Sequence, residues 1–297
     1  GPAKKPGVRL ISPKAQRHII LTPETKDKFR DYGRENIPGD AAYEASYREG
    51  AGLGIAALAM ASTSKVSGDY TNTDYLKAAE DAFAFLEKNN LLFTNDGKEN
   101  IIDDYCALVA ATELYRTTKS SVYKAAADKR ASSLMARLTT SGPYKNYWRA
   151  DDGDRPFFHP VDAGLPVVSL LEYYGIADAE AQKRVRETVK RSFDFEIWVT
   201  EEVANPFGYS RQLVQSKGGA RRTSFFFPHD TETAPWWQGE NARLGSLAAA
   251  ARLASRYFAE DKALQARLQV FARDQLNWIL GLNPFDSCML QDKGRNN

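Results

Sequence analysis

Segments with the apolar periodicity of an α-helix follow one another along most of this chain, and short polar connections join them. In one segment, Leu53, Ala56, Ala57 and Met60 recur at the spacing of a single helix face. No stretch sustains the alternation of apolar and polar residues that is typical of a half-buried strand. The sequence therefore predicts an all-α fold of helical hairpins, arranged either as a closed toroid or as a curved array.

About eight helices are expected, and they cover residues 51–61, 75–86, 101–115, 122–138, 162–174, 178–195, 240–258 and 261–282. Asp74 is expected to cap the second helix, because an Asp side chain accepts hydrogen bonds from free N–H groups in the first turn. Interior glycine costs a helix about 1 kcal/mol relative to alanine. We therefore expect the small residues of the first helix to pack closely against a neighbouring helix. Cys106 is expected to be a small buried apolar residue.

Two longer segments lack a helical period and are rich in aromatic residues. Residues 139–160 predict a surface loop or a small hairpin, and residues 200–235 predict a second irregular segment. Long loops in compact domains often carry function. Residues 1–40 are rich in Pro, Lys and Arg and are expected to be irregular, whereas residues 41–297 are expected to form the helical domain.

The stretch at residues 228–241 combines aromatic and polar side chains immediately before a predicted helix. Trp236 and Trp237 are candidates for stacking on sugar rings, because the apolar C–H face of a pyranose can lie on an indole plane. Glu240 and Asn241 could hydrogen-bond to sugar hydroxyl or amino groups. The alternative is that the tryptophans are interior anchors and that Glu240 and Asn241 only begin the helix.

Three further residues near this stretch are candidates for the same binding site. His229 and Glu232 could line a cleft beside the tryptophans, or could be solvated loop residues. Arg222 could contact a substrate or brace the loops, as could the neighbouring Arg221 and Arg211. The three histidines of the chain are too scattered to predict a metal site, and no cofactor is expected.

The charges nearly cancel, with 40 Lys and Arg against 38 Asp and Glu. This balance gives no reason to expect a nucleic acid or a membrane surface as a partner. No apolar stretch reaches the ~18 residues typical of a transmembrane helix, and the two cysteines permit a reducing compartment. We therefore expect an oligosaccharide as partner and a cytoplasmic location, with the oligomeric state left open.

The C-terminal part of the chain resembles the ending of family 9 glycoside hydrolases. It has Leu-Gly-Leu-Asn-Pro at 280–284 and Gly-Arg-Asn-Asn at 294–297, one helical hairpin after Trp-Gln-Gly-Glu-Asn at 237–241. Segments 47–52 and 205–209 are similar to the branch of the family that contains exo-β-glucosaminidases. The resemblance runs from about Tyr43 to Asn297.

This resemblance implies an (α/α)6 toroid and inverting hydrolysis of β-1,4-linked glucosyl or glucosaminyl oligosaccharides. Inversion needs a carboxylate base and a carboxylic acid about 6.5–9.5 Å apart. The family's base lies in an Asp-Ala-Gly-Asp segment ahead of Tyr43, and its acid follows the Asn-Pro signature; neither has a counterpart here. Asp162-Ala163-Gly164 matches only three letters in a different place. The expectation is either an internal portion of a longer hydrolase or a shortened relative that binds glycans without catalysis.

Overall fold

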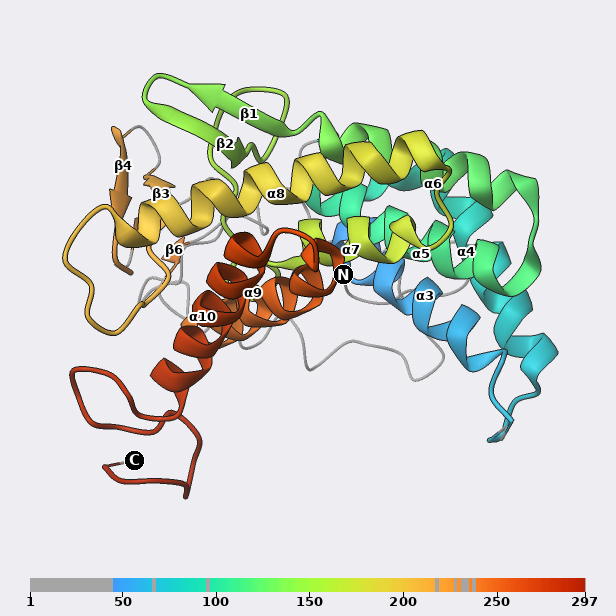
Figure 1. Cartoon of the computed structure of the whole chain (residues 1–297). Helices are drawn as coiled ribbons and strands as arrows, with labels where there is room; N and C mark the ends of the chain where they lie inside the picture. The colour runs from blue at the N-terminus through green and yellow to red at the C-terminus, as the bar shows by residue number, and fades with distance from the viewer. Residues whose placement is uncertain are drawn as a thin grey trace, which may run out of the picture. The chain divides into compact units, whose positions relative to one another are not determined.

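The computed structural model describes residues 45–65, 68–94, 97–216, 219–226, 229–230, 235–236 and 239–296. These residues form eight α-helices, two 3-10 helices and six short strands (Figure 1). The all-α class and the number of helices expected from the sequence are therefore confirmed for the described part of the chain. The irregular segment expected over residues 1–40 lies outside it.

The chain divides into two compact units, one comprising Gly1–Ala126 and Asp230–Pro235, and the other Ala127–His229 and Trp236–Asn297. The first unit contains η1 (Tyr47–Glu49), α3 (Ala51–Ala61), α4 (Asn72–Phe93), α5 (Ile101–Thr118) and the start of α6 (Ser121–Met135). Helix α3 packs closely against α5. A Cβ atom added to Gly52 would lie only 2.7 Å from the Cβ atom of Cys106, which shows this close approach. The prediction of close packing is confirmed, and Cys106 is buried.

The start of α4 differs from the prediction. Thr71, not Asp74, is the N-cap residue: its hydroxyl accepts a hydrogen bond from the Asp74 backbone N–H, 3.2 Å away. The Asp74 carboxylate in turn accepts one from the Thr71 backbone N–H, 2.9 Å away. This reciprocal capping box begins the helix at Asn72, so the assignment of Asp74 as the cap was wrong.

The second unit contains the end of α6, then two helix pairs and short strands. Its elements are β1 (Leu138–Ser141), β2 (Tyr144–Trp148), α7 (Leu165–Tyr174), α8 (Ala179–Glu201), β3 (Gln212–Gln215), β4 (Arg221–Ser224), α9 (Glu240–Ala254), η2 (Ser255–Phe258) and α10 (Lys262–Ile279). Strands β5 (His229–Asp230) and β6 (Pro235–Trp236) pair with each other.

Several boundaries in this unit differ from the expected ones: α7 begins at Leu165 and not at residue 162, and α10 ends at Ile279 and not at residue 282. Helix α6 ends at Met135, and Leu138 instead pairs with Trp148 in the small hairpin expected for residues 139–160. Helix α8 continues past Phe195 to Glu201. Part of the second irregular segment is the β3–β4 hairpin, which pairs Gln212 with Ser224.

Helices α7 and α9 approach each other closely at Gly164, the residue before α7. A Cβ at this position would lie 2.2 Å from the carbonyl oxygen of Ser246, and the Gly164 backbone N–H donates to the Ser246 hydroxyl at 3.0 Å. The Asp-Ala-Gly sequence at 162–164 therefore serves a helix contact in this chain.

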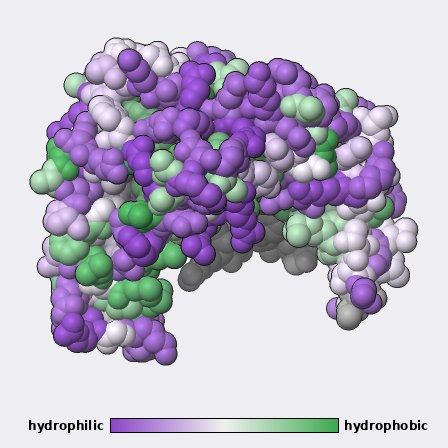
Figure 2. All heavy atoms as spheres, viewed as in Figure 1, coloured by the Kyte–Doolittle hydropathy of each residue, from purple (hydrophilic) through white to green (hydrophobic). Residues whose placement is uncertain are grey.

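The segment after α10 carries several exposed apolar residues. Leu280, Leu282 and Phe285 are each more than half exposed, and Figure 2 shows apolar side chains over this segment at the lower left. The side chain of Asn283 organises the turn, because it donates to the backbone carbonyl groups of Trp278 and Ser287 at 2.9 and 2.8 Å. The Asn of the Leu-Gly-Leu-Asn-Pro sequence is thus a structural residue here.

Candidate functional site

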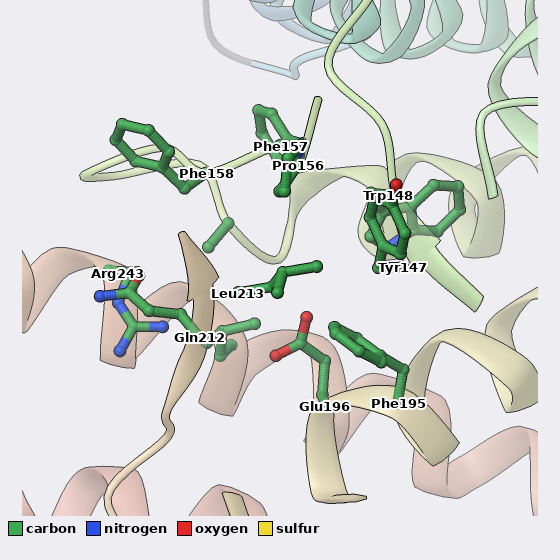
Figure 3. A pocket seen from close by; sticks show the side chains of 12 residues that line it. Tyr147, Trp148, Pro156, Phe157, Phe158, Phe195, Glu196, Gln212, Leu213 and Arg243 are labelled. Atoms are coloured by element: carbon green, nitrogen blue, oxygen red, sulfur yellow. The ribbon is translucent and has the colours of Figure 1, made fainter. Parts of the chain in front are cut away.

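The second unit contains a small pocket surrounded by aromatic side chains (Figure 3). Its volume is about 30 Å³, and one water molecule needs about 10–15 Å³. The enclosed part of the pocket therefore has room for about two water molecules. The residues that line it are Tyr147, Trp148, Pro156, Phe157, Phe158, Ala163, Phe195, Glu196, Gln212, Leu213, Arg243 and Leu247.

Glu196 is the only carboxylate among the described residues that line the pocket. It projects from α8 toward Leu213 in Figure 3, and no hydrogen bond to its side-chain oxygens is found among the described residues. Burial raises the pKa of Glu196 to about 7, and the positive charge of Arg243 only partly opposes this increase. The carboxyl group is therefore part protonated near neutral pH and can both donate and accept hydrogen bonds.

Gln212 places an unsatisfied carboxamide in the same pocket. Its residue is only 6% exposed, yet neither Oε1 nor Nε2 has a hydrogen-bond partner among the described residues. A buried amide without partners costs roughly 1–3 kcal/mol. Neither atom is accessible to water in this structure, so a partner could reach the carboxamide only if the side chain moved.

Arg243 lines one side of the pocket and is fully engaged in ion pairing and hydrogen bonding. Its Nε donates to both carboxylate oxygens of Glu240 at 3.0 Å, and its Nη2 donates to the Ser210 carbonyl at 2.6 Å. Glu240 also accepts a hydrogen bond from the Tyr209 hydroxyl. Burial lowers the pKa of Arg243, but the Glu240 charge outweighs this effect and raises it above the ordinary value.

The segment that precedes Gln212 is held on both sides by buried side chains. The Asn205 amide donates to the carbonyl groups of Thr200 and Tyr209 at 3.0 and 2.8 Å. On α10, the fully buried Gln275 accepts from the Ser210 backbone N–H at 2.7 Å. These contacts, together with Arg243, fix the start of β3 and so the position of Gln212.

The aromatic side of the pocket is braced by the β1–β2 hairpin. The rings of Tyr147 and Phe195 lie 5.9 Å apart, with 49° between their planes. The Tyr147 hydroxyl donates to the Asp154 backbone carbonyl at 2.5 Å and accepts from Arg221 Nη1 at 2.8 Å. Hydrogen bonds from Arg221 and Ser141 lower the pKa of the Asp154 carboxyl group to about 2. The ion pair between Arg221 and Asp154 therefore stays charged at neutral pH.

The sequence-predicted binding residues are found in several places. Glu240 occupies the first turn of α9, where Arg243 and Tyr209 engage its carboxylate, and Asn241 is exposed beside it. Arg222 is exposed on β4. None of these three lines the pocket.

The remaining predicted residues cannot be placed against the pocket. The backbones of His229 and Trp236 lie in the paired strands β5 and β6. Trp237 and Glu232 lie outside the described residues. Their proposed roles in sugar binding therefore stay predictions.

Sequence reasoning missed Glu196 and Gln212 as pocket residues. A signal for Glu196 was present, because Phe193 and Val199 stand three residues before and after it and are both buried on α8. A carboxylate in register with two buried apolar residues points to a buried, functional or paired acid. Gln212 gave no comparable signal, since its strand is only four residues long.

The described residues contain no group of three or more His, Cys, Asp or Glu side chains that could hold a metal ion. Over the same residues, no helix combines the length and the hydropathy that crossing a membrane requires.

The solved structures that this chain resembles include two crystal structures of endoglucanase CelQ from Clostridium thermocellum, one complexed with cellotriose and one with cellotetraose. The first is 16% identical in sequence with a TM-score of 0.49, and the second is 17% identical with a TM-score of 0.47. Each match covers 84% of this chain but only 36% of the matched chain.

The comparison with curated proteins found no match. By contrast, the family model of glycosyl hydrolase family 9 matches residues 40–297, which are most of the chain. This range includes the whole pocket and confirms the family resemblance and the (α/α)6-type fold class expected from the sequence. The chain belongs to glycosyl hydrolase family 9.

Proposed function

We infer that this chain provides the carbohydrate-binding part of a glycoside hydrolase that acts on β-1,4-linked glucosyl or glucosaminyl oligosaccharides by an inverting, two-carboxylate mechanism. The observation that supports this most directly is the pocket, where five aromatic side chains surround the Glu196 carboxyl group, to which no hydrogen bond is found among the described residues. Aromatic faces suit the C–H surface of sugars, and a carboxyl group suits their hydroxyls. Family membership and the cello-oligosaccharides bound to endoglucanase CelQ are consistent with this substrate class.

A second candidate function is glycan binding without hydrolysis. Inversion requires two carboxyl groups about 6.5–9.5 Å apart. Among the described residues that line the pocket, only Glu196 carries a carboxyl side chain. This observation favours glycan binding without hydrolysis for the chain by itself. It favours hydrolysis for a longer protein that contains the chain.

The test is isothermal titration calorimetry of the chain with cellotetraose and with the matching glucosamine tetramer, beside an assay for newly released reducing ends. Binding with release of reducing ends supports hydrolysis by this chain, and binding without release supports the glycan-binding alternative. If neither sugar binds at millimolar concentration, the proposed function is wrong. Trp237→Ala should weaken binding by about 1–3 kcal/mol if the predicted stacking occurs.

A further inference from the structure

A larger groove of the second unit is formed by the end of α8, the segment that follows it and α10. Its volume is about 470 Å³, which falls within the ~300–1,000 Å³ typical of small-molecule sites. It shares no lining residue with the pocket around Glu196. The groove is therefore large enough to hold a ligand of its own.

Much of the lining of this groove is apolar. Ile197 on α8 and Phe271 on α10 line it and are almost fully buried. Val203 and Val270 also line it, and each of them is 43% exposed. A hydrocarbon chain in the groove would remove this exposed valine surface from water, which is favourable by about 25 cal/mol per Å².

The charges that line the groove are not balanced. The described lining residues include two carboxylates, Glu201 and Asp274, and one guanidinium, Arg267. Arg267 Nη2 already lies 3.2 Å from Glu201 Oε2, so the carboxylate of Asp274 is the excess negative charge. Helix α8 ends at Glu201 without a Lys or Arg in its last turn, and the negative end of its dipole also favours a cation.

Asp274 has one carboxylate oxygen that can accept a further partner. Its Oδ1 lies 3.6 Å from Nε of the exposed Arg273, and no hydrogen bond to Oδ2 is found among the described residues. The side chain is 26% exposed, so a ligand can reach it. A Cβ at Gly208 would lie 2.5 Å from Oδ2, so glycine at this position leaves that oxygen uncovered.

The surroundings of Asp274 leave its negative charge incompletely compensated. Burial raises the pKa of Asp274 above its ordinary value, and the charge of Arg273 only partly opposes this increase. A cation beside Oδ2 would stabilise the charged form of the carboxyl group. Along α10, Asp274 follows Arg267 by seven residues, or about 10 Å, which gives room for several methylene groups before the ion pair at Arg267.

We propose that this groove binds a free primary aliphatic amine, whose ammonium group donates to Asp274 Oδ2 and whose hydrocarbon chain lies on the apolar lining. The carboxylate selects the cation, and the valine, isoleucine and phenylalanine side chains select the hydrocarbon chain. The inference does not rest on the proposed function, because no residue of the pocket around Glu196 takes part.

The experiment is a two-dimensional NMR titration of the ¹⁵N-labelled chain at neutral pH with three probes of equal length, hexylammonium, hexan-1-ol and hexanoate. Hexylammonium is expected to bind about tenfold more tightly than hexan-1-ol, because it adds a charge-assisted hydrogen bond to Asp274. Hexanoate should bind more weakly than hexan-1-ol. The backbone amide signals of Val203, Gly208 and Val270 should shift on binding.

Two variants test the two parts of the groove. Asp274→Asn keeps the shape of the side chain, removes its charge and should bring the affinities for hexylammonium and hexan-1-ol to within about twofold. Because burial already disfavours the charged form, this variant should fold with unchanged stability, which a urea titration checks. Val270→Trp fills the groove from an exposed position and should weaken the binding of both probes about tenfold.

The matched control is Asp292→Asn, the same substitution at an exposed position that does not line the groove. It should leave the preference for hexylammonium unchanged. The inference is wrong if hexylammonium does not bind, if the three probes bind equally or if hexanoate binds best. It is also wrong if the preference survives in folded Asp274→Asn or if Val270→Trp has no effect. None of these results bears on the proposed function, which the tetrasaccharide titration tests by itself.

Discussion

Gly164→Ala should destabilise the protein although alanine is normally the better residue in a helical conformation. Gly164 has φ of −88° and ψ of −11°, which any L-residue adopts, so backbone strain plays no part. The added methyl group would instead lie 2.2 Å from the Ser246 carbonyl oxygen and 2.9 Å from the Ala250 Cβ. Helix α9 would have to move by about 1 Å to restore ordinary contact distances.

The expected magnitude follows from two opposing effects. Overpacking of a close contact costs about 1–3 kcal/mol, and the clash with backbone atoms at Gly164 favours the upper part of that range. Replacing glycine by alanine restricts the unfolded chain and returns about 0.4–1 kcal/mol. The free energy of unfolding should therefore fall by about 2 kcal/mol.

The assay is urea denaturation followed by circular dichroism and tryptophan fluorescence. Gly245→Ala is the matched control, because a Cβ at Gly245 on α9 has no atom within 4 Å, and it should raise the free energy of unfolding by about 0.5–1 kcal/mol. Because Ala163 and Leu247 line the pocket beside this helix contact, Gly164→Ala should also weaken cellotetraose binding. An unchanged or higher urea midpoint for Gly164→Ala would refute the assignment of this glycine to helix packing.

Three further perturbations test other parts of the structure. Arg243→Met leaves the carboxylate of Glu240 without its buried ion-pair partner and should cost about 3–5 kcal/mol in urea denaturation, whereas a loss below about 1 kcal/mol would contradict the role of this ion pair. The pKa of Glu196 is raised from 4.5 to about 7 in the folded state, so the folded protein binds more protons than the unfolded chain in that window. Stability should then fall on the order of 2–3 kcal/mol as pH rises from about 4.5 to 8, and Glu196→Gln should remove this component when both proteins are titrated with urea at each pH. Gly52→Ala places a methyl group 2.7 Å from atoms of Cys106 and should lower the thermal midpoint; an unchanged midpoint would show that α3 and α5 can separate at little cost.

The helices were predictable because their signal is local and repeated. Periodic apolar residues identified each helix, but the exact ends depended on interactions that periodicity does not encode. Helix α4 began at Asn72 because the Thr71 hydroxyl and the Asp74 carboxylate cap each other. Leu138 left the predicted helix because strand pairing with Trp148 offers it backbone hydrogen bonds ten residues away.

The pocket was harder to predict because it combines residues that are distant in sequence. The sequence predicted a site at residues 228–241, because aromatic and polar residues are adjacent there in the chain. Glu196 and Gln212 instead come from a helix and a strand, and tertiary contacts bring them to one cavity. Glu240 was predicted either to hydrogen-bond to sugar groups or only to begin the helix. Its carboxylate is engaged by Arg243, which follows three residues later on the same helix, and its role in sugar binding stays a prediction.

The cluster formed by Arg243, Glu240 and Tyr209 has a consequence for how this chain can diverge. One buried guanidinium joins the start of α9 to the segment that leads into β3. Loss of Arg243 or of Glu240 leaves the other charge without its ion-pair partner, whereas joint replacement by apolar residues of similar volume can be neutral or stabilising. Arg243 and Glu240 should therefore be inherited together, and related chains should carry either both or an apolar pair at these positions.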